Sequence, residues 1–299
     1  MAIADFIPEF WSAAVMQPFQ ENLIYAQPSV ANTDYQGTLA QMGDTVHVGT
    51  VGRPTVRPYD IDEDLVTEDI NVTTTDLKVD QGSYFKFRVN DVQALQVAGP
   101  LRDPAMAEAA IGLRDSVDTY AGGVIAAGVH TDHKLGNIEV VDGTDKPGAG
   151  QKSAYHVVLE LRKKLNKASV PTQGRYIVVD ADFEGALLLD DHFVRVDASG
   201  TDQGLRNGIV GRILGFDVLV SNNAPTTGSA GTLRSTIIAG VPAAYSMVTQ
   251  INKVEAAREE KRFADIVKGL MIYGSKVFRP EGLASANIQV KAPTAAGNP

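Results

Sequence analysis

The sequence contains no cysteine among its 299 residues, only one tryptophan, and fewer Lys and Arg residues (27) than Asp and Glu residues (36). Without cysteine, the chain can form neither a disulfide nor a thiolate metal site, and it has no cysteine nucleophile. Its formal charge of −9 excludes a basic nucleic-acid-binding protein, because contacts to phosphates require a positive surface.

Long hydrophobic runs are also missing. No apolar stretch approaches the ~18 to 20 residues that cross a bilayer, and the first residues lack the basic flank of a secretory signal. We therefore expect a soluble protein made in a cytoplasm. With 44% apolar residues, the chain can bury a core as one large or two ordinary domains.

The N-terminal 40 residues predict an arm. Proline and glycine interrupt this segment, so only short helical pieces fit between them. It has too few apolar residues for a core of its own. Its aromatic side chains, among them Phe6, Phe10 and Trp11, are therefore expected to lie on another surface.

The next segment predicts a two-stranded flap. Strand-like sequences at 43–49 and 70–78 flank an excursion that Pro54 and Pro58 keep extended. Because a lone hairpin is marginally stable in water, another surface must hold it.

The far part of the flap is acidic and has no basic residue. Its acidic residues are Asp60, Asp62, Glu63, Asp64, Glu68 and Asp69. A calcium loop does not fit, because Leu65 stands at the position of the required glycine and Asn71 at that of the bidentate glutamate. A solvated charge run is the simple interpretation; the alternative is a contact with basic residues of a neighbouring copy.

The rest of the chain predicts a half-buried strand, a long helix and a mixed α/β lobe. In the strand Phe85, Phe87 and Val89 alternate with Tyr84, Lys86 and Arg88. Asp103 as N-cap and Pro104 at the first helical position open a helix that ends near Ala127. Further helices are expected from Ser153 and over 182–189. Further strands are expected at 138–141, 176–179, 215–220, 234–239, 247–254 and 263–278, the last covered on two sides, before a loose tail at 291–299.

No motif supports catalysis or cofactor binding. The glycine-rich loop before Ser153 has Gln151 where a P-loop needs glycine, and Ser153 replaces the third glycine of a dinucleotide fingerprint. His130 and His133 lie three apart among turn residues, which favours surface histidines over metal ligands. A Gly-x-Ser-x-Gly nucleophile elbow is missing. We therefore expect no catalytic, metal or cofactor residue.

The charged segment 255–262 leaves two interpretations open. As a helical turn it would align like charges four residues apart, Glu255 with Glu259 and Arg258 with Arg262. The alternative is that a partner binds these charges.

Several short sequence segments, taken in order, resemble those of a known protein family. They are Gly43-Asp44-Thr45-Val46, Phe85-Lys86-Phe87-Arg88-Val89-Asn90-Asp91-Val92-Gln93, the segments 171–180 and 208–218, Ser221-Asn222-Asn223, and 263–274. With the order of arm, flap, strand, long helix, lobe and closing strands, the chain resembles the major capsid proteins of tailed double-stranded DNA bacteriophages. The resemblance covers nearly the whole chain.

The resemblance implies an α+β protein with the Hong Kong-97 type capsid fold. Residues 1–43 correspond to the N-terminal arm and 44–80 to the extended loop that lies over an adjacent subunit. Residues 81–149 and 246–299 correspond to the peripheral domain with its spine helix, and 150–245 to the axial domain.

The resemblance also implies the partners. They are copies of the same chain, arranged as hexamers and pentamers in an icosahedral head that encloses double-stranded DNA without sequence-specific binding. A portal and, in some members, decoration proteins complete the virion, which is assembled in the host bacterial cytoplasm without a membrane. Since the chain has no long cleaved N-terminal segment, a separate scaffolding protein is implied. No Lys lies between Val51 and Asp76, so a covalent crosslink there is not expected.

From the charges we expect the acidic flap residues to contact a basic patch on the next subunit. The first candidates are Arg258, Lys261 and Arg262, and the second are Lys163, Lys164 and Lys167. Two other classes remain open: an encapsulin-type nanocompartment shell, which shares the fold, and a soluble α/β enzyme, which would need a concave polar site.

Overall fold

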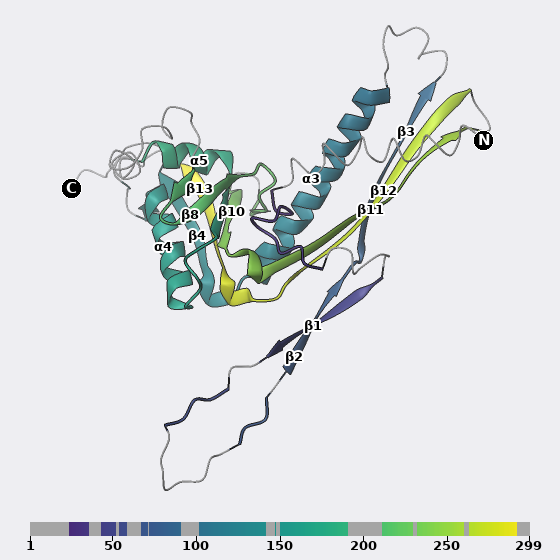
Figure 1. Ribbon diagram of the computed structural model, residues 1–299. Helices are drawn as coiled ribbons and strands as arrows, with labels where there is room; N and C mark the ends of the chain where they lie inside the picture. Colours follow the sequence, from purple (N-terminus) through teal and green to yellow (C-terminus); the bar gives the residue numbers. More distant parts are fainter. Residues whose placement is uncertain are drawn as a thin grey trace.

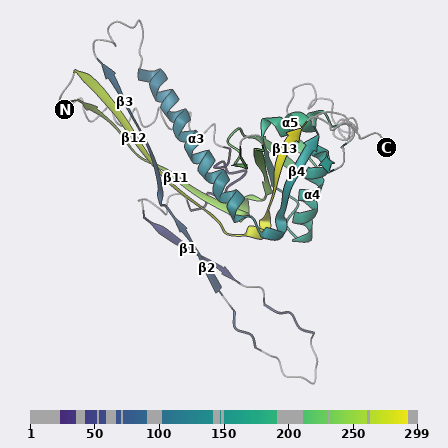
Figure 2. The same ribbon diagram turned by 180° about the vertical axis from the view of Figure 1, so that it is seen from behind.

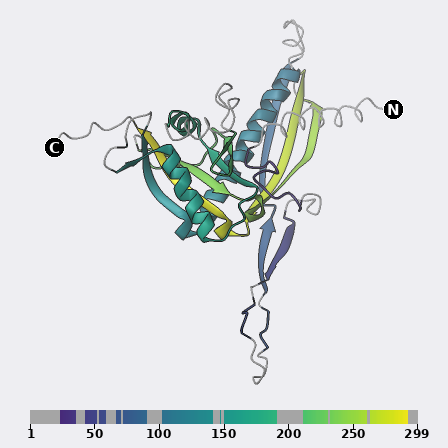
Figure 3. The same cartoon turned by 60° about the vertical axis from the view of Figure 1, so that its left-hand side comes forward.

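A computed structural model describes eleven parts of the chain. They are residues 24–35, 43–51, 54–58, 67–70, 72–90, 102–141, 147, 150–190, 211–229, 232–259 and 263–291. Figure 1 shows three regions: an α/β lobe, a body made of one long helix beside a long sheet, and a flap that extends away from both. The turned view in Figure 3 shows the same arrangement.

The lobe is built on an eight-stranded sheet in the order β5-β4-β13-β10-β6-β8-β7, with β9 paired to β10. Its strands are β4 (Lys134–Val141), β5 (Gln151–Lys152), β6 (Arg175–Val179), β7 (Arg212–Ile213), β8 (Phe216–Val220), β9 (Thr226–Thr227), β10 (Arg234–Gly240) and β13 (Leu283–Lys291). Strands β4 and β5, β4 and β13, and β6 and β8 pair in parallel. Strand β10 is antiparallel to both β6 and β13, so the sheet is mixed.

Helices cover both faces of this sheet. On one face, Ile177 and Val179 of β6 pack with residues of α4 (Ala154–Lys167) and α5 (Ala181–Leu188). On the other, Tyr176 and Val178 pack with α3 (Arg102–Gly128). Helix α4 begins as the sequence predicts, because the Ser153 side chain caps it by accepting from the N–H of His156.

The body consists of α3 against a three-stranded antiparallel sheet in the order β11-β12-β3. The strands are β3 (Gln81–Asn90), β11 (Tyr245–Arg258) and β12 (Ala264–Val277). With 27 residues at ~1.5 Å each, α3 is roughly 40 Å long. Phe85 and Phe87 pack with Met106 of α3, whereas Tyr84 and Lys86 are exposed, which confirms the predicted alternation.

The flap is an antiparallel pair of β1 (Thr45–Val51) and β2 (Val72–Lys78), with Thr45 opposite Lys78 and Val51 opposite Val72. This confirms the two predicted strands. Its root is the buried part: Leu77 and Val79 pack with Val248 of β11 and Ile272 of β12.

The described arm segment, residues 24–35, lies on the body of its own chain. Tyr25 is fully buried in the cluster that joins α3 to the lobe, and its N–H and that of Ile24 donate to the Asp118 carboxylate of α3 at 3.2 Å. The Asn32 N–H donates to the Tyr245 carbonyl oxygen at 2.8 Å. This segment of the arm therefore lies on another surface, as expected, and that surface belongs to the same chain. The buried Asp118 carboxylate holds it there by accepting from its backbone N–H groups.

Three sequence-based expectations need correction. Residues 255–258 continue strand β11 instead of forming a helical turn, because cross-strand neighbours on β12 pair their charges. Helix α3 begins at Arg102, so Asp103 is not its N-cap. In addition, β12 is not covered on both faces along its whole length, since Lys268 and Leu270 are exposed.

Strands β4 and β13 lie in the lobe sheet. The family resemblance assigned residues 134–141 and 283–291 to the peripheral domain together with α3, because they precede residue 150 and follow residue 246. The division into four units stays a prediction.

Candidate functional site

The flap exposes apolar side chains on strand β2 and beyond the paired strands. Val56, Ile70 and Val72 are 88%, 64% and 58% exposed. Among the described flap residues, Leu77 and Val79 at the root are the buried ones. We call Val56, Ile70 and Val72 the flap surface.

Of the acidic flap residues, the structure describes Glu68 and Asp69, both exposed. The Glu68 carboxylate accepts from the backbone N–H and the hydroxyl of Thr55, at 3.1 and 3.2 Å. These two bonds join the arms of the flap where the strands have ended. Glu68 therefore orders the flap itself, and Asp69 is the described acid placed for an outside contact.

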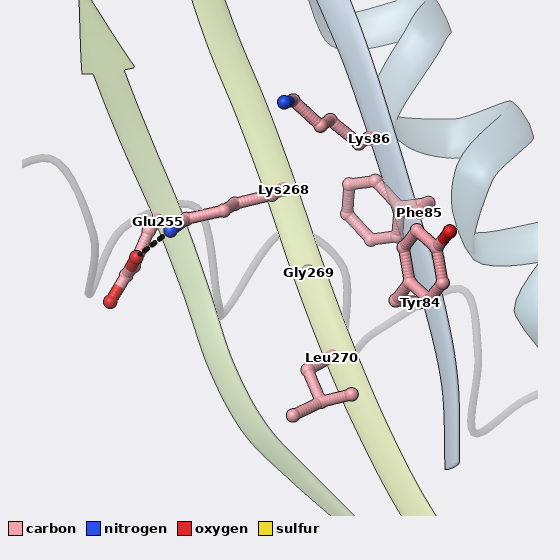
Figure 4. Close-up of a pocket in the computed structure, with 7 residues that line it drawn as sticks. All are labelled: Tyr84, Phe85, Lys86, Glu255, Lys268, Gly269 and Leu270. Atoms are coloured by element: carbon pink, nitrogen blue, oxygen red, sulfur yellow. Dashed lines mark ion pairs between the residues drawn. The ribbon is translucent and has the colours of Figure 1, made fainter.

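A hollow of about 380 Å³ lies on the body sheet, where β12 runs between β3 and β11 (Figure 4). We call it the sheet hollow; it is lined by Tyr84, Phe85, Lys86, Glu255, Lys268, Gly269 and Leu270. Tyr84 and Leu270, directly opposite each other, are 79% and 41% exposed. The ring of Phe85 lies against Gly269, where an added Cβ would come within 2.4 Å of it. The sequence places Tyr84 on a solvent face, but no pattern indicates the exposure of Leu270.

Two pairs of opposite charges link strands β11 and β12, one of them at the hollow. The Lys268 Nζ lies 2.6 Å from a Glu255 carboxylate oxygen, as Figure 4 shows. Arg258, a predicted contact residue, donates to Asp265 at 3.2 Å. These pairs are partly exposed, so each stabilises the sheet by little, about 0–1 kcal/mol.

Among the second basic candidates, Lys164 donates to the Asp132 carbonyl oxygen at 2.7 Å, whereas Lys163 and Lys167 are exposed on α4. The remaining predicted contact residues lie outside the described residues. They are Asp60, Asp62, Glu63, Asp64, Lys261, Arg262, Phe6, Phe10 and Trp11.

A buried carboxyl that the sequence did not reveal lies on α3. Burial raises the pKa of Asp118 to about 6, against the lowering effect of the Ile24 and Tyr25 N–H groups. The one indication in the sequence that Asp118 is buried comes from its neighbours on the helix, because Val117 and Ala121 lie on the same buried face. Its contacts make it an anchor for the arm.

The two histidines considered as ligands have other contacts. Their rings lie 5.7 Å apart, and the Nδ1 of His133 donates to the Leu283 carbonyl oxygen at 3.0 Å. Within the described ranges, no group of three or more His, Asp or Glu side chains could hold a metal ion. In that same part of the chain, every helix is too short or too polar to cross a membrane.

Comparison with known proteins identifies the class. The family model described as phage capsid protein matches residues 73–286. The chain therefore belongs to the phage capsid protein family. It is a structural protein of the virion, a major capsid protein with the Hong Kong-97 type capsid fold, as its resemblance implied.

Solved structures agree. A chain from Mycobacterium phage Che8 is 28% identical, with 89% of this chain and 91% of that chain covered and a TM-score of 0.71. A chain from the capsid of cyanophage P-SCSP1u is 15% identical, with 85% of both chains covered and a TM-score of 0.66. A chain from the capsid of Ralstonia phage GP4 is 12% identical, with 91% and 90% covered and a TM-score of 0.65. The last two show the fold alone. No curated protein sequence matches this chain.

Proposed function

We propose that this capsid protein assembles as hexamers and pentamers into the icosahedral head of a phage, and that its flap connects neighbouring copies. The main support for this proposal is the structure of the flap. It projects from the body with exposed apolar residues, and a two-stranded hairpin in water is marginally stable by itself. Docking on another copy supplies the missing contacts, and the buried area offsets the entropy lost on ordering.

The proposal assigns a different structural role to each region of the chain. Residues 1–43 act as the arm and 44–80 as the extended loop, while α3 with the β11-β12-β3 sheet forms the peripheral body. The α/β lobe meets other lobes around the symmetry axes. Because β4 and β13 belong to the lobe sheet, the axial unit takes in residues 134–141 and 283–291 as well as 150–245.

The proposed partners follow from family membership and charge. A separate scaffolding protein directs assembly in the host cytoplasm, a portal occupies one vertex, and decoration proteins bind outside. The head encloses double-stranded DNA without sequence-specific contacts, since a formal charge of −9 keeps the wall from binding phosphates tightly. The chain has no catalytic role in this proposal.

Expression with and without a co-expressed scaffolding protein tests this proposal. Negative-stain electron microscopy should show closed shells when the scaffold is present. A protein that stays monomeric in size-exclusion chromatography under every condition would contradict it.

A second experiment tests the acidic flap. The double variant Asp62→Lys with Asp64→Lys should form few shells, because charge reversal removes the attraction to a basic patch, while its circular dichroism spectrum stays that of the wild type. Normal shells from this variant at low salt would reject the contact.

A further inference from the structure

The lobe and the body are connected by three crossings of the chain. One runs from α3 to β4, one from β10 to β11 through the turn Pro242–Ala244, and one from β12 to β13 through the turn Pro280–Gly282. Backbone hydrogen bonds hold the crossings together. The His130 N–H donates to the Pro280 carbonyl oxygen at 3.3 Å, and the Phe278 N–H donates to the last carbonyl oxygen of the first turn at 2.9 Å. Crossings that lie side by side form a hinge about which two packed units can turn.

Away from this hinge, the lobe meets α3. The Asn223 amide of the lobe donates to the Asp115 carboxylate of α3 at 3.3 Å. Asp115 lies roughly 20 Å from the hinge end of α3, at ~1.5 Å per residue. Figures 1 and 2 show, from opposite sides, the lobe and the body diverging from the hinge, with the arm segment 24–35 (dark purple) between them. The segment therefore lies where it can set the angle of the hinge.

Tyr25 fills the space between the two units. Its side chain is fully buried in a cluster that contains Val178 and Ile238 of the lobe together with residues of α3. At Gly122 of α3, an added Cβ would lie 3.2 Å from the Tyr25 ring and 3.1 Å from the ring of Pro225 in the lobe. Helix, arm and lobe thus meet at one point. Since a buried aromatic ring provides a large apolar contact area, Tyr25 contributes much of what holds the lobe to α3.

Hydrogen bonds fix the arm segment to the body. The N–H groups of Ile24 and Tyr25 donate to the Asp118 carboxylate of α3 at 3.2 Å. Asn32 pairs with β11 through two backbone bonds of 2.8 and 3.2 Å. The segment is therefore anchored on the body while its buried ring contacts the lobe.

We propose that residues 24–32 act as a latch on this hinge. While Tyr25 is seated, the lobe is held against α3, and when the segment leaves, the lobe can turn away. We call these residues the arm latch. The latch is a property of the single chain, so it goes beyond the proposed assembly and does not depend on it.

The Tyr25 hydroxyl weakens the seat of the latch. This oxygen is buried, and it has no hydrogen-bond partner in the described part of the chain. An unpaired buried hydroxyl costs free energy, because it has lost its hydrogen bonds to water. Leaving the seat restores those bonds, which partly offsets the loss of apolar contact. A contact balanced in this way can open locally while the rest of the fold stays intact.

The absence of native cysteine permits a test with single thiols. Ile238→Cys places a thiol on the face of β10 that is turned toward α3, and Ile237→Cys places one on the opposite face, toward α4 and α5. Both positions are fully buried, so a thiol there reacts with a maleimide only when the contacts around it open. In the unassembled chain, Tyr25→Ala should raise the labelling rate at residue 238 at least tenfold. The rate at residue 237 should change by less than about twofold, because the lobe core stays closed.

Two further variants separate the latch from a general loss of stability. Tyr25→Phe keeps the ring and removes the unpaired hydroxyl, so the labelling rate at residue 238 should equal that of the wild type or fall below it. Asn32→Pro removes an N–H that bonds to β11 without emptying the seat. It should also accelerate labelling at residue 238, and it provides the test if Tyr25→Ala does not fold.

Several results would overturn the latch. The rate at residue 238 could stay unchanged in Tyr25→Ala or Asn32→Pro, or it could rise together with the rate at residue 237, which indicates general unfolding. A faster rate in Tyr25→Phe would show that the ring is not what holds the lobe. None of these measurements needs a shell, so failure of the latch is distinguishable from failure of the proposed function.

Discussion

The lobe sheet and the flap are both made of short strands, but they obtain their stability differently. All five residues of β6 are buried, whereas Leu77 is the one buried residue of the seven in β2. Strand β6 lies between β10 and β8, with helices on both faces, and β2 has β1 as its neighbour. The comparison teaches that a strand's sequence can be suited to a sheet while its stability depends on what covers it.

The largest effect is expected in the lobe core. Phe183→Ala removes a fully buried ring from the cluster between α5 and the sheet, so the free energy of unfolding should fall by about 3–5 kcal/mol. Urea denaturation of the unassembled chain, followed by circular dichroism, measures this. The half-exposed Leu189 provides a control, since Leu189→Ala should cost less than about 1 kcal/mol. Equal losses for both variants would contradict the contrast.

The next effect concerns the arm anchor. The pKa of Asp118 is raised from 3.8 to about 6 in the fold, so the folded state binds this proton more tightly than the unfolded state. The resulting stabilisation is complete below pH 3.8 and is lost as the pH rises through about 6. At ~1.4 kcal/mol per pH unit, the total is roughly 3 kcal/mol for this buried group.

The variant Asp118→Asn isolates this contribution, because an amide does not titrate. Relative to the wild type, its free energy of unfolding should rise between pH 4 and pH 7 by up to roughly 3 kcal/mol. Parallel pH profiles for the two proteins would show that the carboxyl is not held in a raised-pKa environment.

A matched pair of substitutions compares the two regions directly. Val178→Thr buries a hydroxyl in β6 and should cost about 1–3 kcal/mol, whereas the same change at exposed Val72 should alter the unassembled chain by less than about 0.5 kcal/mol. Thermal unfolding of both variants checks this. If Val72→Thr is as costly as Val178→Thr, the flap is packed in the free chain and needs no second copy.

Local patterns predicted much of the fold. The alternation around Phe85 and Phe87 is confirmed in β3, and the predicted start of a helix near Ser153 is confirmed in α4. Strand β13 was missed because its LASANIQVK sequence has small residues and no strict alternation. Its central position between β4 and β10, far away in sequence, buries it.

The candidate site was predicted less well. The sequence indicated the flap and its acidic residues, but it gave Glu68 a role outside the chain, whereas Glu68 binds Thr55. The sequence also favoured Arg258 as a partner contact. It could not reveal that Arg258 pairs with Asp265, because this pair forms only when β11 and β12 are adjacent in the fold. The sheet hollow could not be predicted from the sequence, because it depends on how far along β12 other residues of the chain pack against that strand.

By itself the sequence determined the kinds and order of most elements, the excess of acidic groups and the absence of thiol chemistry, because these depend on residue type and near neighbours. The tertiary structure alone decided which strands are neighbours, that Asp118 is buried beneath the arm, and that Tyr84 and Leu270 remain uncovered. The physical reason is that burial and charge pairing depend on contacts between residues separated by tens to hundreds of positions, and no local pattern encodes those contacts.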